Sequence, residues 1–64
     1  MTKLDHDKIK NEAILNLMAA IEAKTQKMFH EIDPELEERC IQALGPKGNK
    51  VFYMNLLGKM YEEL

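Results

Sequence analysis

The chain has 64 residues, of which 45% are apolar or aromatic and 31% are charged, and its formal net charge is −2. A chain this short forms one domain at most. It buries only about 60% of the surface that its unfolded form exposes, so its core is small. Its lone cysteine cannot form an internal disulfide. The start of the sequence is charged and no run reaches about 18 apolar residues, so we expect a cytoplasmic protein without signal peptide or membrane span.

The first predicted helix covers about residues 5–32, because apolar side chains recur on one face at helical spacing. This face contains Ile14, Leu17, Met18, Ile21, Thr25, Met28, Phe29 and Ile32, with Leu15 at its edge. Asp7 and Asn11 occupy the same stripe farther upstream. We therefore expect residues 1–10 to be peripheral to the core.

A second, short helix is predicted over residues 34–44. Pro34 disfavours the helical conformation of Asp33, whose carboxylate can then cap the new helix while Pro34 takes its first position. The helix is closed by Gly45 and Pro46. Its apolar face consists of Leu36, Cys40, Ile41 and Leu44.

A third helix is predicted over residues 50–64, after a turn at 45–49 and with Asn49 as its cap. Apolar side chains cover about 160° of this helix, which is more than one neighbouring helix can hide. They are Tyr53, Met54, Leu56, Leu57, Met60, Tyr61 and Leu64. Because so short a chain has few other surfaces to cover them, we predict that these seven residues form an interface.

The helix lengths predict an all-α fold, a helical hairpin with a broken second arm. The first helix would span about 40 Å, and the other two laid end to end would span the same length. Neither a disulfide nor a zinc site is available to support the small core, so oligomerisation is the remaining support. We expect two hairpins to pair as a homodimer in a helical bundle.

The polar residues show no spacing typical of catalysis. His6 and His30 have acidic neighbours, but neither has a second histidine at metal-ligand spacing. Cys40 lies on an apolar helix face, where cysteines behave as small hydrophobic residues. We therefore expect a protein that is not an enzyme and holds no metal or cofactor.

An anion-binding loop is a possible exception. Lys47, Gly48, Asn49 and Lys50 precede a helix N-terminus, where backbone N–H groups and two lysines could hold a phosphate. The segment lacks the strand and the spacing of a P-loop. We favour the interpretation that it is simply a Gly/Pro turn with two solvated lysines.

These patterns predict a non-catalytic interaction or regulatory protein that binds another protein as a homodimer. The alternative is a nucleic-acid-binding transcriptional regulator whose dimer presents lysines from both chains. The candidate cations are Lys8, Lys10, Lys24, Lys27 and the loop lysines. The C-terminal helix disfavours this alternative, because it presents Leu, Met and Tyr and ends near two glutamates that DNA would repel. The identity of the partner and the direction of the dimer stay open.

Overall fold

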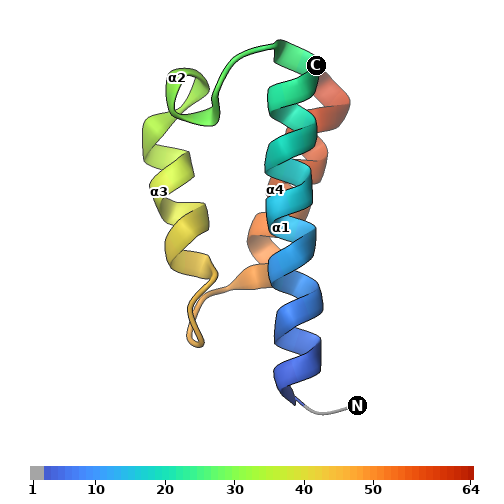
Figure 1. Cartoon of the computed structure of the whole chain (residues 1–64), viewed down its shortest axis with the longest axis vertical. Coiled ribbons are helices and arrows are strands. Elements are labelled where there is room, and N and C mark those ends of the chain that lie inside the picture. The colour runs from blue at the N-terminus through green and yellow to red at the C-terminus, as the bar shows by residue number, and fades with distance from the viewer. Residues whose placement is uncertain (1–2) are drawn as a thin grey trace.

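Three helical segments run up, down and up along the long dimension of the molecule, and a fourth, very short helix joins the first two (Figure 1). The structure is a computed structural model that describes the backbone of residues 3–64 and the side chains of residues 5–64. Its helices are α1 (Lys3–Thr25), α2 (Phe29–Ile32), α3 (Pro34–Ala43) and α4 (Lys50–Glu63). The prediction of an all-α fold is confirmed.

The predicted first helix is wrong beyond Thr25, because the chain turns there and starts again as α2. Gln26 adopts a positive φ of 58°, which ends the helix in a left-handed conformation. The carboxylate of Glu22 then accepts a hydrogen bond from the Phe29 N–H at 2.7 Å. A side chain of α1 therefore caps the start of α2 and fixes the turn between them.

Replacing Gln26 by glycine should raise the free energy of unfolding by about 0.5–1 kcal/mol. Glycine adopts a positive φ without the steric cost that other residues carry, although it also increases the entropy of the unfolded chain. Urea denaturation followed by circular dichroism measures the change. Gln26→Ala is the control and should give no gain; equal effects of both substitutions would show that residue 26 lacks this conformation in solution.

The return of the chain also differs from the predicted hairpin, because α3 and α4 do not lie end to end. The Lys24 Nζ lies 4.5 Å from the centre of the Tyr61 ring and donates to the Tyr61 carbonyl at 3.3 Å. Asn11 Nδ2 donates to the Leu44 carbonyl at 3.2 Å. The carboxyl ends of α1 and α4 therefore meet, which makes these helices parallel, while α3 runs antiparallel to both (Figure 1).

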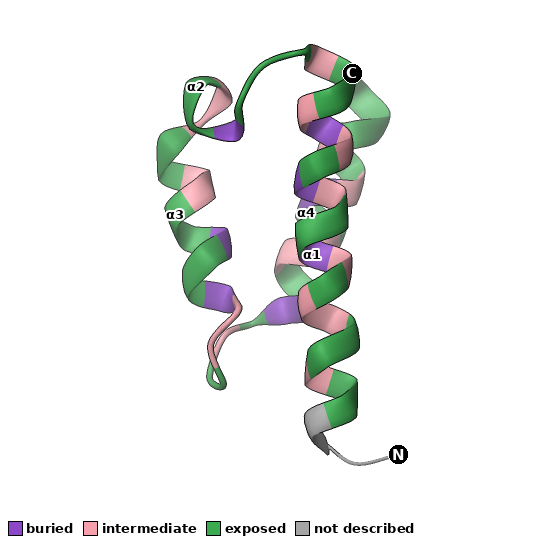
Figure 2. Ribbon diagram, viewed as in Figure 1, coloured by how far each residue is buried: buried purple, intermediate pink, exposed green. Residues whose placement is uncertain are grey.

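The core lies where the three longer helices face one another (Figure 2). Its buried apolar residues are Ile14, Met18, Ile21, Phe29, Cys40, Ala43 and Leu57. All of them except Ala43 belong to a predicted apolar face. Leu15, Met28 and Ile41 were expected on or beside such faces, but each is about half exposed. Residues 5–10 are exposed or only partly buried, and residues 1–2 lie outside the described part of the chain.

Both predicted helix caps are confirmed. The Asp33 carboxylate accepts from the Leu36 N–H at 3.0 Å, with Pro34 as the first residue of α3. The Asn49 side-chain oxygen accepts from the Phe52 N–H at 3.2 Å. These caps fix where α3 and α4 begin, and therefore which side chains of the two helices face each other.

Candidate functional site

Two hollows follow one another between α3 and α4, and together they form a surface that we call the α3–α4 groove. The first hollow has a volume of about 530 Å³ and lies beside the turn that joins the helices. The second has a volume of about 310 Å³ and lies farther along the same helix pair. The first is lined by Arg39, Gln42, Ala43, Gly45, Pro46, Lys47, Gly48, Asn49 and Tyr53, and the second by Leu36, Leu56, Lys59, Met60 and Glu63.

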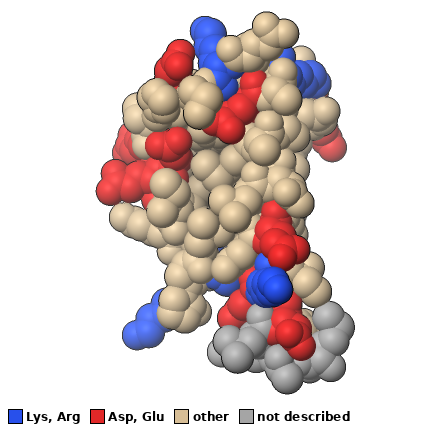
Figure 3. Space-filling model, viewed as in Figure 1, with Lys and Arg blue, Asp and Glu red and all other residues tan. Residues whose placement is uncertain are grey.

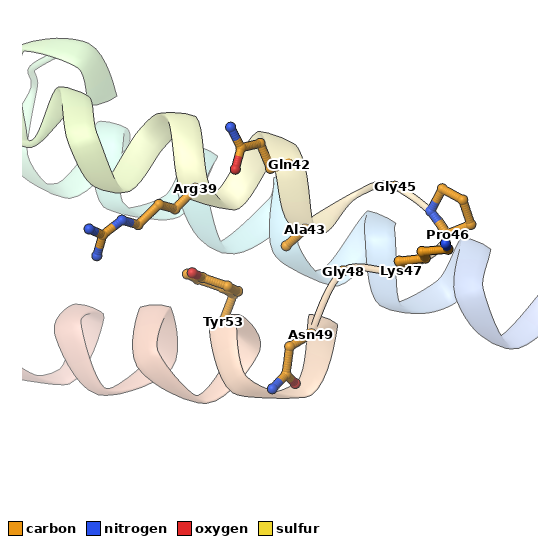
Figure 4. Close-up of a pocket in the computed structure, with 9 residues that line it drawn as sticks. All are labelled: Arg39, Gln42, Ala43, Gly45, Pro46, Lys47, Gly48, Asn49 and Tyr53. Atoms are coloured by element: carbon orange, nitrogen blue, oxygen red, sulfur yellow. The ribbon is translucent and has the colours of Figure 1, made fainter.

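Arg39 and Tyr53 face each other across the first hollow, one from α3 and the other from α4 (Figure 4). Arg39 Nη2 also pairs with Glu35 Oε1 at 2.9 Å, but both side chains are mostly exposed. Such an exposed pair contributes about 0–1 kcal/mol and exchanges readily with other partners. The guanidinium of Arg39 therefore stays accessible to an anionic group that enters the groove.

The closing turn of the groove is stabilised by Lys50, which is only 6% exposed. Its Nζ donates to the carbonyl of Ala43 at 2.8 Å and to that of Gly45 at 2.6 Å. The Ala43 carbonyl lies at the carboxyl end of α3, where backbone acceptors have no helical partner and a positive charge is favoured. The Gly45 carbonyl follows in the turn and also accepts from the Gly48 N–H at 3.1 Å. The Lys50 ammonium group, for which the sequence favoured solvent and offered an anion as the alternative partner, is thus directed at backbone carbonyls instead.

The rest of the predicted anion loop is divided between two roles. Lys47 is exposed on the turn, whereas the Asn49 side chain already caps α4. A smaller hollow of about 210 Å³ brings Asp7 and Lys10 of α1 next to Gly48 and the start of α4. The sequence spacing did not predict that Asp7 and Lys10 lie beside this turn, because their position depends on how α1 docks against α4. Anion binding at this loop stays a prediction.

The seven predicted interface residues of α4 are divided between the core and the surface. Leu57 has no exposed surface, so the structure moves it from the predicted interface to the core of the chain. Tyr53, Met54 and Met60 are partly buried against the core. The residues that remain exposed are Leu56 (37%), Tyr61 (38%) and Leu64 (47%).

Two exposed residues of α4 were not among those predicted. Val51 and Phe52 lie outside the apolar arc, and both are about half exposed. Phe52 precedes Leu56 by four residues, which places the two side chains one above the other on the helix. With Lys59 and Glu63 one and two turns farther along, they form a mixed stripe, which we call the Phe52–Leu56 stripe. The i, i+4 spacing was the signal for it.

Cys40 is fully buried, and burial raises the pKa of its thiol above the ordinary value of 9.0, with the nearby Asp33 charge adding to the shift. We expect slow reaction of this thiol with a disulfide reagent in the folded protein and fast reaction in urea.

The raised pKa of Cys40 also predicts a dependence of stability on pH. The unfolded thiol ionises at a lower pH than the folded one, so the stability that comes from keeping Cys40 neutral is complete below about pH 9. The free energy of unfolding should fall as the pH rises further. Urea denaturation across that pH range tests the slope, and Cys40→Ala should remove it.

The remaining candidates are dispersed over the molecule. His6 and His30 are exposed, and the described residues contain no group of three or more side chains arranged to hold a metal ion. Lys24 is held against the Tyr61 ring, while Lys8 and Lys27 are exposed near opposite ends of α1. Within residues 3–64, no helix combines the length and the apolar character needed to cross a bilayer. No family model matches the sequence, and neither a curated protein nor a solved structure matches it.

Proposed function

We propose that this chain is a non-catalytic helical interaction protein that acts as a homodimer and binds another protein. The observation that carries the proposal is the number of large apolar side chains at the surface. Among the side chains of residues 5–64, the exposed ones are Ile9, Leu15, Met28, Ile41, Val51, Phe52, Leu56, Tyr61 and Leu64. Scattered exposed apolar residues are normal, but five of these nine lie within residues 51–64. The C-terminal helix therefore supplies most of the surface for a partner.

The total surface supports an association of this kind. The chain exposes 4708 Å² and has a mass of 7.4 kDa. A compact monomer of that mass would expose about 4,200 Å². A partner of standard size covers about 800 Å² on each side, so a second copy could remove the excess together with the apolar side chains.

The lining of the α3–α4 groove favours binding over catalysis. Arg39, Lys47 and Tyr53 line the first hollow, and nucleophilic catalysis would instead need a nucleophile beside a general base. Tyr53 combines an apolar ring with a hydroxyl group, which is typical of protein interfaces. The groove is thus suited to a polypeptide with apolar side chains and some negative charge.

Measurement of molar mass over a dilution series tests the homodimer. We expect twice the 7.4 kDa of one chain at high concentration and dissociation on dilution. A mass of one chain at every concentration would reject the proposal.

Retention of a protein from the native extract tests the second part of the proposal. The wild-type chain should retain a partner and Val51→Asp should lose it, whereas Lys27→Ala, an exposed residue outside α4, should keep it. Binding to duplex DNA at low salt that weakens steeply as salt rises would instead favour the nucleic-acid alternative.

A further inference from the structure

We infer that the second copy binds in the α3–α4 groove, with its α4 antiparallel to the α4 that lines the groove. This inference rests on the proposed homodimer and adds its location and direction. The Phe52–Leu56 stripe shares Leu56, Lys59 and Glu63 with the lining of the groove, so a two-fold dimer can use both surfaces on each chain. Each copy would offer a stripe and receive one.

No helix within residues 3–64 covers the open side of the groove, which is lined by α3, α4 and their turn. Near the turn, the Lys50 ammonium group joins α4 to the carboxyl end of α3. Farther along, the second hollow separates Leu36 of α3 from Leu56 and Met60 of α4. An amphipathic helix binds such a groove through apolar side chains one turn apart. Phe52, which is 53% exposed, and Leu56 have this spacing.

Antiparallel pairing aligns the side chains of one α4 with the groove residues of the other. With Leu56 of each copy near the two-fold axis, Phe52 of one copy lies beside Met60 of the other, over the second hollow. Glu63 of the same copy then lies beside the turn of the other, where the first hollow begins. One arrangement therefore places Phe52 over the second hollow and Glu63 beside the turn that carries Lys47.

Charge decides the direction of the pair. Among the described residues, the charged side chains that line the first hollow are Arg39 and Lys47, and both are positively charged. In the view of Figure 3, a cationic side chain projects at the lower left, where Figure 1 places the turn between α3 and α4. A parallel dimer would set Glu63 against Glu63 and Lys59 against Lys59 at the axis. The antiparallel dimer instead sets Glu63 beside the turn that carries Lys47 and sets Lys59 beside Tyr53, and it also opposes the two helix dipoles.

Disulfide trapping between chains that carry one added cysteine tests this arrangement. Chains with Lys47→Cys and chains with Glu63→Cys are mixed and oxidised with copper phenanthroline. We expect a fast disulfide between the two different chains and little between two identical ones. The wild-type chain, whose Cys40 is buried, is the control and should give no dimer under the same conditions.

The outcomes separate the two proposals. Fast trapping of Glu63→Cys with itself would overturn the antiparallel direction. A dimeric mass without trapping of the mixed pair would overturn the groove as its location and leave the homodimer standing. A monomeric mass at every concentration would overturn both.

Charge reversal gives a second readout that does not depend on a new cysteine. Lys47→Glu should weaken dimerisation about threefold to tenfold, and adding Glu63→Lys to the same chain should restore most of the loss. Both variants change exposed side chains, so circular dichroism should show the same helix content as the wild type. Failure of the second substitution to restore the dimer would contradict contact between the two positions.

Discussion

Replacement of Leu57 by alanine is expected to lower the free energy of unfolding by about 2–5 kcal/mol. Leu57 is the fully buried residue of α4 that joins this helix to the core residues of α1 and α3. The substitution removes buried methyl groups and leaves a cavity that the surrounding side chains fill only in part. A domain of this length has about 3–10 kcal/mol of stability in total, so the variant should be unfolded or close to it.

Leu56→Ala is the matched control, because the same residue type stands one position away with 37% of its surface exposed. We expect it to lower the stability of the single chain by less than about 1 kcal/mol and to weaken the dimer instead. Urea denaturation at a fixed low concentration measures the first effect, and molar mass on dilution measures the second. Equal losses of stability for the two variants would contradict the separation of core from surface on α4.

This contrast shows what the sequence could predict about α4. Helical spacing identified the apolar arc that contains Leu56 and Leu57. The asparagine after the Gly/Pro turn identified the cap at Asn49. It could not say which part of the arc the chain itself covers, because that depends on where α1 and α3 dock. The parallel docking of α4 on α1 buries Leu57 and leaves Leu56 at the edge of the α3–α4 groove.

The break after α1 was hidden for a different reason. Chains that end a helix in a left-handed conformation usually place glycine there, whereas this chain has Gln26. The apolar pattern continues through Phe29 and Ile32, which pack on the core from α2 as they would from a longer α1. Periodicity therefore predicted the burial of these side chains correctly and the path of the backbone wrongly.

Lys50 shows the limit of assigning roles by residue type. A lysine in a Gly/Pro turn is normally solvated, and the sequence offered an anion as the alternative partner. In the structure its ammonium group instead satisfies carbonyls at the end of α3. The position of those carbonyls depends on the path of the turn, so only the three-dimensional structure could reveal this role.

Replacement of Gly48 by alanine should have the second large effect, a loss of about 1–3 kcal/mol or more. A side-chain carbon at residue 48 would overlap the backbone of Ala43, which is part of α3 and cannot move as a flexible side chain would. Relief of this overlap would push the turn away from α3 and separate the Lys50 ammonium group from its two carbonyl partners. The substitution should therefore destabilise both the turn and the first hollow of the groove.

Gly58→Ala is the control for Gly48→Ala and should change stability in the opposite direction. Gly58 lies within α4, and an added carbon there would meet no atom within 4 Å apart from its chain neighbours and the nearby backbone of its own helix. Alanine should stabilise the helix by about 0.5–1 kcal/mol, because glycine loses more conformational entropy on folding. Thermal and urea denaturation of both variants measure the difference. If Gly48→Ala were as stable as Gly58→Ala, the close approach of the turn to α3 would be absent in solution, and the closed end of the α3–α4 groove would be absent with it.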